Sequence, residues 1–153
     1  MAKQMIKGLT MLLLIVALSL VTAVASANGQ SSKQQRANIP FEFVVGDQEM
    51  SAGSYSVASA TSEALKISGT ENGMSTFRLS HAINGLTPAE KGKLVFRRYG
   101  NHYFLAEVWT AGESQGRRLL KSKGEKAIER EYTAIRSRNE QSYERVEIAL
   151  VRQ

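Results

Sequence analysis

The 153-residue sequence contains no cysteine, two prolines, one tryptophan and two histidines, and Asp47 is its single aspartate. The absence of cysteine excludes disulfide bonds, a lipidated N-terminal cysteine and thiolate metal sites. His81 and His102 stand far apart in the sequence and do not have the spacing of a metal-ligand cluster. We therefore expect no metal and no other cofactor.

The chain opens with an uncharged apolar segment. Lys3 and Lys7 precede the run LLLIVALSLVTAV, and Ala25-Ser26-Ala27 offers a small-x-small cleavage site. This pattern predicts a secretory signal peptide over residues 1–27 and an exported protein, periplasmic or secreted. A retained membrane anchor is the alternative, although the run is shorter than the ~20 residues of a membrane span. Residues 28–37 lack large apolar side chains and are expected to form a flexible leader.

The charge of the chain is moderately positive. Lysine and arginine exceed the acids by 20 to 14, a formal net charge of +6, and removal of residues 1–27 would take away two lysines and leave +4. Such a surplus commonly serves solubility, and it also permits contact with an anionic envelope component. The basic residues from Arg117 to Lys126 have no aromatic residues among them, so no specific nucleic-acid site is expected.

Residues 38–153 are expected to form a single β-rich domain. Short alternating runs bounded by turn residues recur every 8–12 residues or so, and in one of them Phe77, Leu79 and His81 share a face. A helical pattern covers about 123–138, opened by Ser122 and Glu125 at capping-box spacing, and a closing strand covers about 143–151. The fold class is therefore mainly β: a small antiparallel barrel or sandwich of about 7–8 strands with one helix near the C-terminus.

The segment 93–110, KLVFRRYGNHYFLAEVWT, predicts a β-hairpin whose two-residue loop is Gly100-Asn101. In an uninterrupted register, this loop pairs residues whose numbers sum to 201. The resulting pairs include Phe96 with Leu105, Arg98 with Tyr103, and Leu94 with Glu107. Glu107 would then share an apolar face with Trp109, where an uncompensated carboxylate is costly, so a structural ion pair is expected there.

The leading functional hypothesis is a non-enzymatic binding or envelope-associated module with a small apolar ligand at one barrel mouth. It predicts an internal cavity that is open at one end. The candidate ligand-binding residues are Phe77, Arg98, Tyr103, Glu107 and Trp109. A purely structural or interaction protein of the cell envelope is an alternative function.

An enzyme is the second alternative. Residues 112–116 match G-x-S-x-G, the pattern of a nucleophile elbow, with Ser114 at its centre. That fold requires the order serine, acid, histidine, whereas His81 and His102 both precede Ser114. A small secreted hydrolase-type enzyme would instead need His81 or Glu107 to share a cleft with a nucleophile or a second acid. No catalytic residue is assigned, and we expect the protein not to be an enzyme.

Three segments carry a resemblance to other proteins: NIPFEFVVGD at 38–47, AGSYSV at 52–57 and KLVFRRYGNHYFLAEVWTAG at 93–112. In this order behind a signal peptide, the sequence resembles a group of small, uncharacterised exported bacterial β-rich proteins. The likeness extends from Asn38 to about Lys121. It implies export and a compact β domain, and it implies no catalytic or ligand-binding residues.

Overall fold

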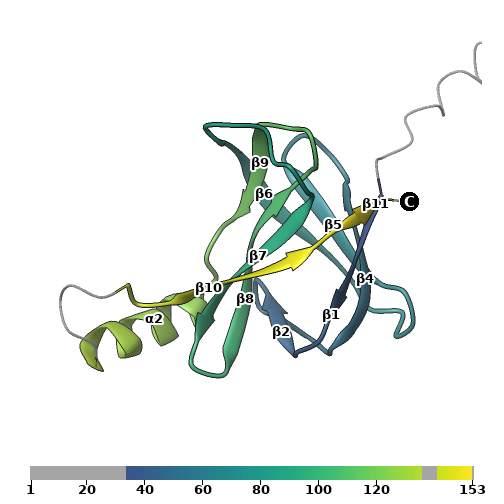
Figure 1. Cartoon of the computed structure of the whole chain (residues 1–153). Helices are drawn as coiled ribbons and strands as arrows, with labels where there is room; N and C mark the ends of the chain where they lie inside the picture. The colour runs from purple at the N-terminus through teal and green to yellow at the C-terminus, as the bar shows by residue number, and fades with distance from the viewer. Residues whose placement is uncertain (1–33, 136–140, 153) are drawn as a thin grey trace, which may run out of the picture. The chain divides into compact units, whose positions relative to one another are not determined.

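The computed structural model describes residues 34–135 and 141–152, which form eleven short strands and one helix (Figure 1). The helix, α2, spans Lys123–Ile135. The strands are β1 Gln35–Ile39, β2 Phe43–Val45, β3 Gln48–Met50, β4 Gly53–Ser59, β5 Ala64–Gly69, β6 Ser75–Asn84, β7 Lys93–Tyr99, β8 His102–Trp109, β9 Gln115–Leu119, β10 Glu144–Ala149 and β11 Val151–Arg152. The predicted mainly β fold with one helix near the C-terminus is confirmed. The predicted number of strands is too low, partly because the closing strand is divided at Leu150.

The strands follow one hydrogen-bonded path in the order β10-β7-β8-β9-β6-β5-β4-β1-β11, and neighbours on the path are antiparallel. β2 lies off the path and pairs with β3 and, in parallel, with β8. The sheet is open, because its end strands β10 and β11 are joined through Leu150 and not by a ladder. Of the two predicted architectures, barrel and sandwich, the closed barrel is therefore wrong. The closing segment pairs with β7 before Leu150 and with β1 after it.

β6 makes the corner between the two halves of the sheet. Its residues up to Leu79 pair with β5, and those from Ser80 onwards pair with β9. Thr76 and Ser80 are buried, whereas Phe77 and Leu79 are 59% and 66% exposed. The apolar row expected from the sequence therefore exists, but it faces outwards. The buried Ser80 hydroxyl is satisfied by Arg117, whose Nη2 donates to Oγ at 3.0 Å.

The interior is occupied by apolar side chains from both halves of the sheet. Phe43 packs edge-to-face against Tyr55 and Phe96, with ring centroids 5.0 and 5.5 Å apart. The ten largest fully buried side chains are Tyr55, Tyr99, Phe43, Phe96, Ile39, Met50, Leu65, Ile67, Leu94 and Val45. These side chains form a packed core, and the clefts described below open at the surface.

α2 is attached to the outer face of β7 by a buried ion pair. The Ser122 hydroxyl caps the helix by accepting the Glu125 backbone N–H at 3.1 Å, as the capping box predicts. The Glu125 carboxylate, however, binds the guanidinium of Arg97, with Nη2 and Oε2 3.1 Å apart. Burial opposes the charge on Arg97, but the bond to Glu125 outweighs it and raises the pKa of Arg97. The helix is thus held to β7 by this ion pair and by Tyr132, whose ring packs edge-to-face on Tyr99 with centroids 6.1 Å apart.

The sheet begins earlier than predicted. β1 starts at Gln35, and Gln35 and Ala37 are buried, so residues 35–37 belong to the sheet and not to a flexible leader. These residues alternate buried and exposed positions while pairing with β4, which the polar composition concealed. The expected signal peptide at 1–27, the rest of the leader up to 33, and helix positions 136–138 lie outside the described residues. No helix in 34–135 or 141–152 is long and apolar enough to cross a bilayer.

Candidate functional site

A β-bulge decides where Glu107 and Trp109 lie. The hairpin keeps its predicted register from the turn as far as Phe96 and Leu105, and the register then shifts by one residue at Ala106. The pairs beyond the bulge are Val95 with Glu107 and Leu94 with Val108. Because one extra residue exchanges the two faces of a strand, Glu107 and Trp109 lie on the outer face of the sheet and not on the predicted core face.

Glu107 is the centre of a hydrogen-bonded ion cluster. Its side chain is 8% exposed. Arg118 donates to Oε1 from Nε and Nη2 at 3.0 and 2.8 Å, and Arg145 Nη2 lies 3.6 Å from Oε2. Burial alone would raise the pKa of Glu107, but hydrogen bonds from Trp109 and Arg118 and the nearby positive charges outweigh it and lower that pKa. The carboxylate is therefore ionised at neutral pH and unsuited to act as a general acid.

Trp109 is fixed in two ways. Its indole Nε1 donates to Glu107 Oε2 at 2.9 Å. Its ring covers Gly116, the cross-strand partner on β9: a Cβ atom added there would lie 2.7, 2.7 and 2.9 Å from three indole carbons. These similar distances place the face of the ring over the glycine. An aromatic ring over a strand glycine supplies packing that the glycine lacks, and here it also holds the indole in one orientation.

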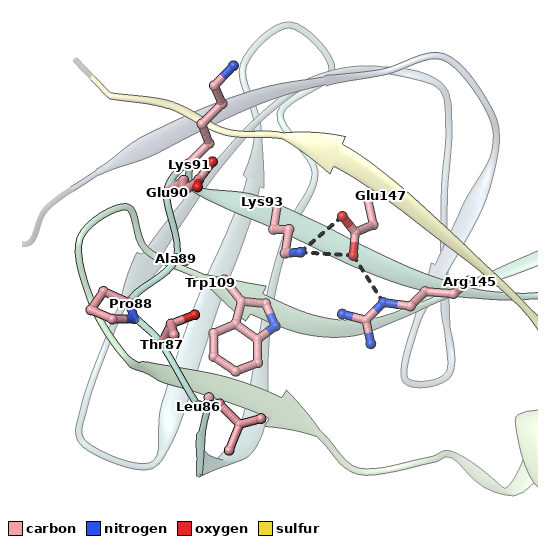
Figure 2. Close-up of a pocket in the computed structure, with 11 residues that line it drawn as sticks. Leu86, Thr87, Pro88, Ala89, Glu90, Lys91, Lys93, Trp109, Arg145 and Glu147 are labelled. Carbon is pink, nitrogen blue, oxygen red and sulfur yellow. Dashed lines mark hydrogen bonds and ion pairs between the residues drawn. The ribbon is translucent and has the colours of Figure 1, made fainter.

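The indole borders a surface cleft of about 580 Å³ (Figure 2). One wall is the segment between β6 and β7, which includes Leu86 and Pro88. The other is a chain of ion pairs, in which Lys93 Nζ lies 2.9 Å from Glu147 Oε1 and Arg145 Nε lies 3.0 Å from the same oxygen. We call this space the Trp109 cleft; its lining residues are Gly85, Leu86, Thr87, Pro88, Ala89, Glu90, Lys91, Lys93, Trp109, Arg145 and Glu147.

Comparison with known proteins adds no relative. The chain matches no family model, no curated protein and no solved structure. The expected likeness to small exported β-rich proteins stays a prediction.

The second predicted pair, Arg98 and Tyr103, lies at the hairpin end, away from Trp109. Tyr103 stacks on Phe41 with ring centroids 4.0 Å apart, and the Arg98 guanidinium lies 5.3 Å from the tyrosine centroid. Tyr103 lines a cleft of about 510 Å³ whose walls include Met50 and Met74. We call this the Tyr103 cleft. Of the five predicted site residues, Tyr103 and Trp109 line two different clefts. Arg98 lies over the Tyr103 ring, Glu107 is bonded to Trp109, and Phe77 is exposed elsewhere.

The residues considered for catalysis do not converge. His81 pairs across the sheet with Arg118, four residues along β9 from Ser114, which separates the two backbones by roughly 13 Å. His81 shares a surface cleft with Ser62 and Glu63 but has no side-chain hydrogen bond or ion pair to any described residue. Within the described ranges, no group of three or more histidine, aspartate or glutamate side chains could hold a metal.

Several residues around Glu107 and the Trp109 cleft were missed from the sequence. Arg118 lies on the next strand, β9, whereas Arg145 and Glu147 belong to β10, which is far from Glu107 in the chain and reaches the site only because it pairs with β7. Arg98, which would share the face of Glu107 in the predicted register, binds Glu144, at 3.2 Å. A signal was present in the alternating charges Arg145 and Glu147, which place both side chains on one face of β10.

Proposed function

We propose that this protein is an exported, non-enzymatic binding module whose ligand site is the Trp109 cleft. Export rests on the signal-peptide pattern of residues 1–27. The single observation that carries the binding site is the fixed indole: one face rests on Gly116, Nε1 is bonded to Glu107, and the ring borders an open cleft. A preoriented ring binds a flat apolar surface without losing rotamer entropy.

The charges of the cleft favour a neutral, hydroxyl-rich ligand. The charged lining residues are Glu90, Lys91, Lys93, Arg145 and Glu147, so three cations and two carboxylates leave one net positive charge. Lys93 and Arg145 are both paired with Glu147. An ionic ligand would have to compete with these internal pairs, whereas hydroxyl groups can use the remaining N–H donors and lone pairs.

An oligosaccharide has both a flat apolar surface and many hydroxyl groups. The C–H face of a sugar ring is weakly positive at its hydrogens and fits the negative face of an indole. Its hydroxyl groups would reach the paired charges beside the ring. The cleft volume of about 580 Å³ is in the usual range for small-molecule sites, ~300–1,000 Å³. We therefore assign the ligand to the saccharide class.

Calorimetric and fluorescence titration tests this proposal, and Trp109 is a direct reporter because it is the sole tryptophan. The probes are cellotetraose and chitotetraose as neutral glycans and tetragalacturonate as an acidic one. A neutral glycan is expected to shift the emission and to bind in the high micromolar to millimolar range. Trp109→Phe should weaken binding and Trp109→Ala should remove it, because their rings cover less surface or none.

Phe77→Ser serves as the control, since Phe77 lies outside the cleft. Absence of a signal with all three glycans at about 10 mM, or unchanged calorimetric binding by Trp109→Ala, would show that the proposal is wrong.

The Tyr103 cleft supports a second candidate function, the binding of a small apolar ligand. Its walls include Met50 and Met74, and methionine adapts its shape to irregular apolar ligands. N-phenyl-1-naphthylamine, a neutral dye that fluoresces in apolar sites, is the probe. Met74→Ser should lower the affinity for the dye severalfold while leaving glycan binding unchanged. Equal dye binding by the unmodified protein and the Met74→Ser variant would exclude this site.

A further inference from the structure

The outer surface around β6 exposes apolar side chains that the described fold leaves uncovered. Phe77, Leu79 and Leu120 are 59%, 66% and 62% exposed. Leu119 pairs with Ser80, so Leu120 emerges from the sheet beside Leu79. We call these three residues the β6 patch. A contiguous group of exposed large apolar side chains commonly marks an interaction surface.

The β6 patch has an exposed aromatic ring at one end and a hollow at the other. Phe77 stands at the first end, where it pairs across the sheet with Lys66. Beyond Leu79, on the other side, lies a cleft of about 470 Å³. Its lining residues are Ser62, Glu63, Leu79, Ser80, His81, Ala82 and Leu120. The cleft therefore begins at Leu79 and extends away from Phe77, which lies two residues, or about 7 Å, before Leu79 along β6.

The charged side chains of the patch are divided between the same two ends. The Lys66 ammonium lies 5.6 Å from the centroid of the Phe77 ring. Glu63 lines the hollow. Neither side chain has an ion-pair partner among the described residues. The patch is thus positive at the Phe77 end and negative at the hollow.

We propose that a second copy of this chain binds the β6 patch, with a two-fold axis passing close to Leu79. A two-fold axis brings opposite ends of one surface together, so each Phe77 would enter the cleft of the partner subunit. The same rotation places Lys66 against Glu63 of the partner subunit. Both the shape and the charge of the patch are therefore complementary to themselves.

A lipid surface fits this patch less well. Binding to an anionic bilayer requires a surplus of basic side chains around the apolar residues. Here one lysine and one glutamate, both without partners, flank the apolar residues and cancel in charge. The patch also has an exposed ring at one end and a hollow at the other, which suits a shaped protein partner.

Sedimentation velocity of the purified protein between about 1 and 100 µM tests the proposal. A dimer that dissociates on dilution is expected. Phe77→Ser should remain monomeric throughout this range and stay folded, since most of its side chain is exposed. Leu86→Ser is the matched control, because Leu86 is fully exposed in a different segment and its loss should leave dimerisation unchanged.

Reversing the charges of Lys66 and Glu63 distinguishes a second copy of this chain from other partners of the β6 patch. Lys66→Glu and Glu63→Lys should each weaken dimerisation roughly tenfold, because each pair occurs twice about the axis. The double variant should restore it. A monomer at every concentration, or a double variant weaker than both single ones, would overturn the proposal. Stronger binding of Glu63→Lys to phosphatidylglycerol vesicles with no dimer in solution would likewise overturn it, in favour of a lipid surface.

Discussion

The indole of Trp109 occupies the space that a side chain at Gly116 would need. A Cβ atom at Gly116 would lie 2.7 Å from indole carbons, closer than two such atoms can approach. The two residues are also cross-strand partners between β8 and β9. The glycine is therefore required by the ring above it and not by its backbone, because its φ is not positive.

Gly116→Ala should displace the indole and destabilise the protein by about 1–3 kcal/mol through overpacking. Urea unfolding gives the free energy, and the emission maximum of Trp109 should shift because its hydrogen bond to Glu107 is disturbed. Gly124→Ala is the control: it lies in α2, its nearest neighbour would be 3.7 Å away, and alanine favours a helix. A Gly116→Ala protein as stable as the Gly124→Ala protein would contradict the assigned packing.

Removing one partner of the buried pair Arg97 and Glu125 should destabilise the fold strongly, whereas replacing both partners with apolar residues should destabilise it little. The side chains are 8% and 3% exposed, so removing one partner leaves a buried charge uncompensated. Arg97→Met and Glu125→Leu should each cost about 3–5 kcal/mol, and the double variant should recover most of that loss. Double-mutant analysis of urea unfolding measures the recovery. If the double variant lost the sum of the two single losses in stability, the two groups would not interact.

Acid should remove the contribution of Glu107 to stability. Its pKa in the folded protein is lowered, chiefly by hydrogen bonds that outweigh burial. A group with a lowered folded pKa stabilises the fold above its unfolded pKa of about 4.3, and this stabilisation is lost as the pH falls through the folded value. Glu107→Gln should therefore be less stable than the unmodified protein by roughly 1–3 kcal/mol at pH 7, and the difference should shrink towards pH 3. A difference that does not vary with pH would exclude an ionised Glu107.

Deletion of Ala106 should leave the hairpin able to fold, because Ala106 is the extra residue of the bulge. Without it, an uninterrupted register pairs Val95 with Glu107 and Leu94 with Val108, which are the pairs of the native sheet, so Glu107 keeps its outward position. Circular dichroism and urea unfolding should show that a cooperative transition is retained. Loss of that transition would mean that the bulge itself, and not only the pairing beyond it, is required for folding.

Local features of the fold were predictable from the sequence. Gly100-Asn101 set the hairpin turn and its register as far as Phe96 and Leu105, because a two-residue loop fixes the pairs next to it. Ser122 marked the start of α2, because its hydroxyl needs only a backbone N–H three residues away. Both features depend on neighbours in the chain.

Features that depend on distant partners were not predictable. Nothing local announced the bulge at Ala106, so Glu107 was assigned to the wrong face. Its partners Arg118 and Arg145 reach it from β9 and β10, through strand pairing that only the folded sheet defines. The outward direction of Phe77 has the same origin, since strand alternation gives two faces without saying which one is buried.

Leu150 also has a consequence for the order of folding. The strand that follows it pairs Arg152 with Gln35, so the first and last strands described are neighbours, separated by nearly the whole described chain. Contacts between residues so far apart form late, because the loop between them must first be ordered. The joining of β11 to β1 must wait until Val151 and Arg152 have been synthesised. Completion of this sheet is expected to be a slow step that only a polypeptide containing β11 can take.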